Sequence, residues 1–257
     1  MYGRVLYLVA ALSAAASPIG AADSAVPIAI SGAVADLHRP PEQANLDAQR
    51  KPAQMIGFAG VKPRDRVADF MPGNAYFTRI LSKVVGPTGK VYAFIPEEEI
   101  KNCKPSEIAG SRAIEHDPNY RNVVQLSGPV NQFSAPQKLD VIWTAQNYHD
   151  LHDSFLGPAD IKSVNKAFFD SLRPGGVLIV IDHAAAAGSG LRDTESLHRI
   201  DPSNARREIE GAGFVFEGEI DDLKNHNDDH SRSVFDPAIR GKTDQFVYKF
   251  RKPDKAK

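Results

Sequence analysis

The sequence predicts an α/β fold around one doubly wound sheet of seven strands, mostly parallel, with an antiparallel C-terminal hairpin. Three observations lead to this prediction. Strand-like apolar runs alternate with helical patterns from residue 66 to residue 213. The run at 177–183 is apolar almost throughout, as in a strand that is covered on both faces. The last two strand-like runs have no helical pattern between them, so they are expected to pair antiparallel.

The first elements follow an aperiodic stretch rich in Ala and Pro, so residues 23–44 are expected to form a loosely packed N-terminal arm. A helix is expected from about Asn45 or Pro52 to Gly60, where glycine can end it. A strand at Arg66–Phe70 leads into a helix over 75–85, which has apolar pairs at 76/77, 80/81 and 84/85. Further strands are expected at 91–95, 122–128 and 139–145.

The second half begins with a helix over 159–176 that ends in Pro-Gly-Gly, followed by the strand at 177–183. Asp201 and Pro202 are a capping residue and a first-turn proline before a helix over 203–213. Strands at 214–220 and 243–252 complete a domain that we expect to span 45–252, with a tail at 253–257. The polar connection at 221–242 is long for a compact domain, which favours a binding element.

Composition narrows the class of partner. The net charge is −1 with 25% charged residues, so neither nucleic acid nor an anionic membrane is expected as a partner. The single cysteine, Cys103, excludes an internal disulfide. The sequence does not indicate an oligomeric state.

The N-terminus has the features of a secretory signal. Arg4 precedes an apolar run from Val5 to Ala16, and small residues follow at 20–22. The apolar run is shorter than the roughly 20 residues that a membrane span needs. We therefore expect a signal peptide over 1–22, a mature chain beginning near Asp23 in the periplasm or outside the cell, and no stable membrane insertion after cleavage. The alternative is an uncleaved anchor or a disordered apolar tail.

Two segments carry the candidate chemistry. The loop MPGNA at 71–75 lies at the carboxyl end of the first strand, where this class of sheet binds ligands and where free N–H groups favour a carboxylate. The alternative is a plain strand-to-helix turn, because only Gly73 is a glycine. The segment 147–153 follows the fourth strand and includes His149, and histidine is the residue type that titrates near neutral pH, as suits a base or an orienting group. The alternative is that these polar groups cap the strand.

Other polar residues are less specific. His183 ends the fifth strand and is expected to approach His149, because neighbouring parallel strands end at the same edge of the sheet. Arg192 and Arg199 lie in a charged loop that fits either an anionic substrate or a solvated surface. The pairs His149/His152 and His226/His230 have helical spacing but lie in expected loops, so no metal site is predicted.

Four phrases carry a family resemblance: NYHDLHD (147–153), LRPGGVLIVIDHAA (172–185), GSGLRDTESLHRIDP (188–202) and DDHSRSVFDPAIRGKTDQFVYKFRKP (228–253). With the order of elements, they resemble the predicted methyltransferases with signal peptides of Gram-negative bacteria, within the class I S-adenosylmethionine-dependent superfamily. The resemblance covers about residues 45–252. It implies a Rossmann-like sheet, S-adenosylmethionine as cofactor, and methyl transfer in the cell envelope to a small or medium-sized acceptor.

The resemblance also implies site residues. Asp69 stands at the acidic position of the cofactor motif and Gly73 at its central glycine. Glu97 is the implied contact for the ribose, and the backbone of Gly128 and Val130 the implied contact for the base. The other implied cofactor contacts are Met71, Asn74, Ala75 and Thr144. The implied acceptor-side residues are Asn147, Tyr148 and His149, with His149 as base. Two alternatives stay open: a methyltransferase-like ligand-binding protein without methyl transfer, and a metal-dependent enzyme that uses the histidine-rich rim.

Overall fold

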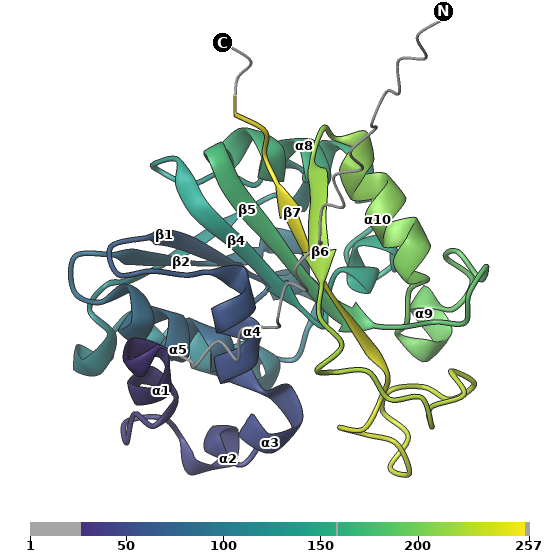
Figure 1. Ribbon diagram of the computed structural model, residues 1–257, viewed down its shortest axis with the longest axis horizontal. Helices are drawn as coiled ribbons and strands as arrows, with labels where there is room; N and C mark the ends of the chain where they lie inside the picture. The colour runs from purple at the N-terminus through teal and green to yellow at the C-terminus, as the bar shows by residue number, and fades with distance from the viewer. Residues whose placement is uncertain (1–26, 158, 255–257) are drawn as a thin grey trace, which may run out of the picture.

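The computed structural model describes residues 27–157 and 159–254; the predicted signal peptide lies outside these residues. Its strands are β1 (Arg66–Phe70), β2 (Lys90–Pro96), β3 (Val123–Gly128), β4 (Leu139–Ala145), β5 (Leu172–His183), β6 (Val215–Glu219) and β7 (Gln245–Arg251). They form one sheet in the order β3-β2-β1-β4-β5-β7-β6 (Figure 1). β7 is antiparallel to both of its neighbours, and the pairs from β3 to β5 are parallel. The predicted fold class is confirmed.

The helices connect these strands. They are α1 (Ile28–Val34), α2 (Pro41–Ala44), α3 (Asp47–Arg50), α4 (Pro52–Ala59), α5 (Tyr76–Val85), α6 (Glu97–Asn102), α7 (Ala109–Ile114), α8 (Ile161–Ser171), α9 (Thr194–Leu197) and α10 (Pro202–Gly211), with short 3-10 turns at Pro105–Glu107, Pro118–Tyr120, Val130–Gln132 and His149–His152. α10 begins as predicted, because the Asp201 carboxylate accepts a hydrogen bond from Ser203 N and Pro202 takes the first helical position.

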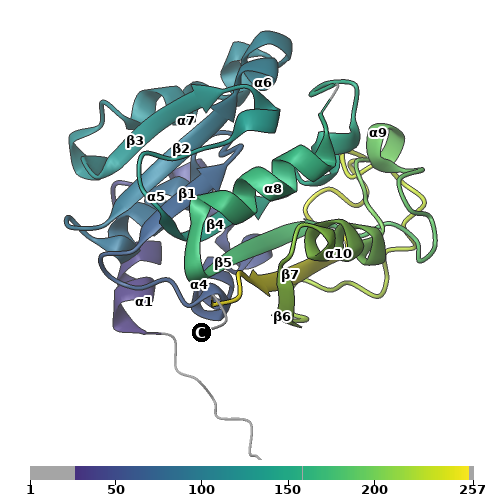
Figure 2. The same ribbon diagram turned by 90° about the horizontal axis from the view of Figure 1, so that it is seen from above.

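Helices cover both faces of the sheet (Figure 2). One face packs with α1, α4, α5 and α7 in an apolar core that includes Trp143 and Ile179. The other face packs with α8 and α10 in a second core that includes Phe70 and Leu178. Leu178 and Ile179 are consecutive and enter opposite cores, as the period of two in a strand requires. Burial of both faces explains why the strands are nearly continuous apolar runs.

Two expected elements differ from the structure. The segment expected to be a loosely packed arm contains α1, whose Ile30 and Ala33 are buried in the first core. Its short length and small residues hide this packing from a periodicity argument. The strand expected to begin at residue 177 begins at Leu172, which pairs with Leu139 of β4 before a shift in register. The Pro-Gly-Gly segment therefore bends a strand rather than ending a helix.

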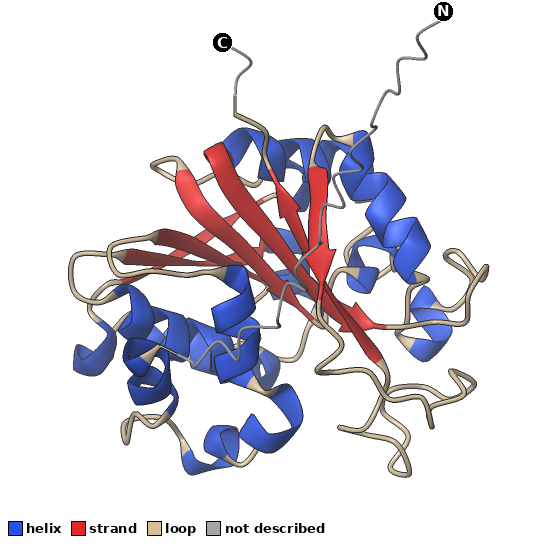
Figure 3. Cartoon of the chain, viewed as in Figure 1, coloured by secondary structure: helices blue, strands red, loops and turns tan. Residues whose placement is uncertain are grey.

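The long connection between β6 and β7 is drawn as loop in Figure 3. Gln245, which begins β7, pairs with His183 at the carboxyl end of β5. The connection therefore returns to the edge of the sheet where β4 and β5 end. Within the described part of the chain, no helix combines the length and apolar character that crossing a membrane requires.

Candidate functional site

The loop after β1 has an unusual backbone. Met71, Gly73 and Ala75 have positive φ values of 55°, 53° and 63°. This left-handed conformation costs a non-glycine residue roughly 1–2 kcal/mol. Glycines at positions 71, 73 and 75 would adopt this left-handed conformation without strain, whereas Met71 and Ala75 adopt it at a cost in conformational free energy.

Neighbouring elements hold this loop through its carbonyl groups. Ser111 donates from its hydroxyl to Gly73 O, and Asn74 O accepts from Gln43 Nε2 at 2.7 Å and from Arg79 Nη1 at 2.8 Å. No hydrogen bond among residues 27–157 and 159–254 uses the N–H groups of Gly73 or Asn74. These two N–H groups precede a ten-residue helix, α5, so they remain free for an anion.

Asp69 does not face this loop. Its carboxylate accepts a hydrogen bond of 2.6 Å from Thr78 Oγ1 of α5, and the side chain is buried. Burial raises the pKa of Asp69 to about 7, against smaller opposing effects from Thr78 and Arg50. Asp69 therefore joins β1 to α5 under the loop and supports its shape.

Asn147 ties the end of β4 to the same loop. Its amide donates to Met71 O at 2.7 Å and to Phe70 O at 3.3 Å, and its Oδ1 accepts from the Thr144 hydroxyl. Asn147 and Thr144 are both buried. They position the loop rather than present free polar groups to a ligand.

The residues expected to contact the ribose and the base differ in whether their polar groups are free. Glu97 is exposed at the start of α6, directly after β2, where a ribose contact is expected. Gly128 ends β3 opposite Pro96. Of the backbone groups expected to read the base, the Val130 N–H is already bonded, because Glu98 Oε2 accepts its hydrogen at 3.0 Å. Glu98 belongs to α6, and no pattern in the sequence predicts its contact with Val130, which lies in the 3-10 turn after β3.

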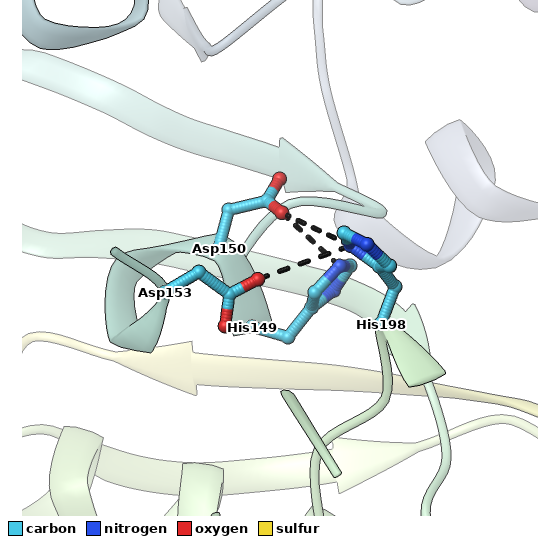
Figure 4. Close-up of side chains that lie close together, drawn as sticks. All are labelled: His149, Asp150, Asp153 and His198. Carbon is cyan, nitrogen blue, oxygen red and sulfur yellow. Dashed lines mark ion pairs between the residues drawn. The ribbon is translucent and has the colours of Figure 1, made fainter. Parts of the chain in front are cut away.

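Four side chains converge where β4 and β5 end: His149, Asp150, Asp153 and His198 (Figure 4). His149 Nε2 lies 3.2 Å from Asp150 Oδ1, and His198 Nδ1 lies 3.7 Å from that oxygen and 3.8 Å from Asp153 Oδ2. The first three residues belong to the segment after β4, and His198 follows α9. Two loops thus build one cluster.

Asp182 fixes the ring of His149. This carboxylate is fully buried in β5; it lies 2.8 Å from His149 Nδ1 and accepts the His149 backbone N–H at 2.7 Å. Burial alone lowers the pKa of His149, but the charges of Asp182 and Asp150 outweigh it and hold the pKa well above 6.5. The same pairing outweighs burial at Asp150 and holds its pKa at about 2. His149 is therefore charged at neutral pH and has no free lone pair to accept a proton.

A further buried carboxyl, that of Glu99, interacts with the charge of Asp150 in this cluster. Glu99 of α6 is buried, and its Oε2 has no hydrogen-bond partner among the described residues. Burial, reinforced by the charges of Asp150 and Glu107, raises the pKa of Glu99 to about 8. This carboxyl is mostly protonated at neutral pH.

The remaining polar residues of this edge have partners elsewhere. Tyr148 is fully buried, and its hydroxyl bonds to Asn165 Nδ2 at 2.8 Å and to Glu208 Oε2 at 3.3 Å. The expected acceptor-side position of Tyr148 is therefore wrong: its side chain packs between β4 and helices α8 and α10. His152 Nε2 also bonds to Glu208, at 3.1 Å.

His183 approaches His149 as expected, with ring centroids 6.1 Å apart, but its Nδ1 bonds to Thr243 Oγ1 at 2.8 Å. Burial lowers the pKa of His183 to about 4, so this ring stays neutral. Arg199 is not available to a substrate, because it is fully buried and pairs with Asp228 at 2.9 Å. It anchors the long β6–β7 connection to the sheet.

Sequence reasoning gave no role to Asp153 or Asp182, and it offered His198 only as one histidine of the rim in the metal-enzyme alternative. Asp182 had a signal, since a carboxylate inside an apolar strand requires a partner. No pattern in the sequence signals the approach of His198 to Asp153, because their loops meet only in the folded chain. Surface hollows of about 360, 480 and 600 Å³ lie elsewhere and are not lined by any predicted site residue.

The architecture is similar to that of solved methyltransferases. An S-adenosylmethionine-dependent methyltransferase from Aquifex aeolicus matches with a TM-score of 0.54 and 17% identity over 83% of this chain and 98% of that one. The chain has the methyltransferase fold. An S-adenosylmethionine-dependent methyltransferase from Mesorhizobium loti matches with a TM-score of 0.54 and 11% identity over 80% of this chain and 99% of that one. The [4+2]-cyclase SpnF matches with a TM-score of 0.55 and 14% identity over 85% of this chain and 84% of that one. No family model and no curated protein matches the sequence.

Proposed function

We propose that this protein is an S-adenosylmethionine-dependent methyltransferase that acts in the cell envelope on a small or medium-sized acceptor. The observation that carries the proposal is the backbone of residues 71–75. Met71 and Ala75 hold a left-handed conformation that glycine would adopt without strain. Strain of this kind persists where the surrounding structure imposes it, commonly at ligand sites.

The residues present fit the methionine portion of the cofactor. The N–H groups of Gly73 and Asn74 would hold its carboxylate, and Glu97 would hold the ribose hydroxyls, since a carboxylate accepts two hydrogen bonds. When bound, the cofactor supplies a methyl group on a sulfonium. Asn147 keeps the loop in place through its bonds to Met71 O and Phe70 O.

On the acceptor side we assign His149 an orienting role. The sequence favoured it as a base, but a ring paired with Asp182 and Asp150 is already protonated. Both of its ring N–H groups face carboxylates, so His149 would orient the acceptor through Asp150, which it holds in place, and would not remove a proton.

Calorimetry with S-adenosylmethionine tests the proposal. Gly73→Ala adds a side chain at φ 53°, where only Glu107 O lies near, at 3.9 Å. Gly60→Ala is the matched control, because Gly60 also has a positive φ, 74°, and only Lys249 Nζ near the added Cβ, at 4.0 Å, but it caps α4 and lies outside the 71–75 loop. We expect binding by the wild type, at least about tenfold weaker binding by Gly73→Ala, and an unchanged affinity in Gly60→Ala. Absence of heat from the wild type would refute cofactor binding.

A second candidate has its own observation. Glu98 occupies the Val130 N–H that would otherwise read the base, which favours a methyltransferase-like protein that binds another ligand in the same cleft. SpnF is named as a cyclase although its fold is similar, so related architecture supports more than one activity. A folded wild type that ignores S-adenosylmethionine would favour this candidate.

A further inference from the structure

The cluster at the ends of β4 and β5 has the dimensions of a metal site. One ligand atom from each of His149, Asp150, Asp153 and His198 lies within 4.8 Å of all the others. Bonds of about 2.0–2.2 Å to a tetrahedral ion place neighbouring ligand atoms about 3.3–3.6 Å apart. The measured separations of 3.2, 3.7 and 3.8 Å are close to that range.

A second observation points to a missing ligand. Asp153 is 4% exposed, and its Oδ1 has no hydrogen-bond partner in the described part of the chain. An unsatisfied buried acceptor costs about 1–3 kcal/mol, and more when it is charged. Its other oxygen faces His198 Nδ1 at 3.8 Å, which is too far for a hydrogen bond. Oδ2 is therefore the oxygen that faces the cluster, without a hydrogen bond to His198, while Oδ1 of the same buried carboxylate has no partner among the described residues.

The group behind His149 completes the arrangement. Asp182 holds Nδ1 at 2.8 Å and the backbone N–H at 2.7 Å, so the ring can turn only Nε2 toward Asp150. A carboxylate on the far nitrogen of a histidine is the usual support of a metal-bound imidazole, because it fixes the ring and raises its basicity.

We propose that His149, Asp150, Asp153 and His198 bind one divalent transition-metal ion. The ion takes the place of the proton on His149 Nε2, because a ligating imidazole nitrogen must be deprotonated, so binding releases that proton. Two imidazole nitrogens beside two carboxylate oxygens favour zinc or a neighbouring transition ion over magnesium and calcium, which prefer oxygen ligands alone. The side chains of Asp150 and His198 are 20% and 30% exposed, so the ion has a path from solvent. The ion lies at the edge where we place the acceptor, and it would orient an acceptor oxygen or nitrogen.

The structure selects this set over the histidine pairs that the sequence offered. His152 bonds to Glu208, His183 to Thr243 and His230 to Asp244. The metal site does not depend on methyl transfer, so its test uses metal binding alone.

The experiment is calorimetric titration of ZnCl₂ into the mature protein after dialysis against a chelator. Asp150→Asn and His198→Asn each remove one ligand. Asn suits position 198, where φ is 53°, because it tolerates the left-handed conformation. His152→Asn is the matched control, because His152 lies three residues from His149 but is bonded to Glu208. Circular dichroism checks that each variant is folded.

We expect one zinc ion per chain in the wild type, at least about tenfold weaker binding in each ligand variant, and an unchanged affinity in His152→Asn. Wild-type protein that gives no heat overturns the proposal, whatever the variants do. Equal binding by a folded Asp150→Asn or His198→Asn also overturns it. If one variant does not fold, the other decides.

Discussion

Replacing Asp69 by Asn should change how stability depends on pH. The wild-type carboxyl is buried against Thr78, and burial raises its pKa from 3.8 to about 7. Between these two values the folded chain keeps a proton that the unfolded chain has lost, so the free energy of unfolding falls as pH rises. Each unit of difference between the folded and unfolded pKa is worth about 1.36 kcal/mol, so the loss in the free energy of unfolding approaches about 4 kcal/mol above pH 7. Asn keeps an acceptor for Thr78 and cannot ionise.

The assay is urea unfolding of wild type and Asp69→Asn from pH 5 to pH 8. The stability of the variant relative to the wild type should rise by about 2–3 kcal/mol between pH 5 and pH 7 and then level off. Thr78→Val is the control, because losing that donor raises the pKa of Asp69 further and moves the change to higher pH. A relative stability that stays constant across the range would refute the burial argument.

Three further predictions concern other parts of the chain. Gly211→Ala should stabilise the protein by about 0.5–1 kcal/mol, because it adds a helix-favouring residue in open space at the end of α10. Gly213→Ala should destabilise it by more than about 1 kcal/mol, since φ is 102° and a Cβ would lie 3.3 Å from the Phe169 ring. Thermal unfolding compares the two variants, and equal shifts in their melting temperatures would contradict both expectations. Asn147→Ala should cost about 1–3 kcal/mol in urea unfolding and weaken S-adenosylmethionine binding, because Met71 O loses its donor; a stable variant with unchanged affinity would contradict the positioning role. N-terminal sequencing of protein from a periplasmic extract should begin near Asp23, and full-length protein in the soluble cytoplasm would disprove the proposed localisation.

The sequence predicts the centre of the sheet well because β1, β2, β4 and β5 are mainly buried on both faces. Leu178 and Ile179 enter opposite cores, so the run from Val177 to Ile181 is apolar without interruption. The helix at 75–85 was predicted for a related reason, since its apolar pairs repeat at helical spacing. The start of β5 was missed because Pro174 and the two glycines signal a break, whereas Leu172 already pairs with Leu139.

The candidate site could be predicted only in part. Position in the chain placed His149 at the correct edge, but side-chain direction in an irregular segment follows no simple period. Tyr148 therefore enters the core while His149, one residue later, meets Asp150 and His198. Contacts between separate loops, such as Glu98 with Val130, depend on the packed structure and leave no local pattern.

The position of β7 has a consequence for synthesis. The strands from β1 to β5 can pair with one another without β7, whereas β6 contacts the sheet only through β7. Until residues 245–251 have been made, β5 has an open edge and β6 has no partner strand. Open edges invite pairing with other chains. A nascent or truncated chain would therefore be prone to aggregation and a natural target for chaperones, which can hold it until the last strand inserts.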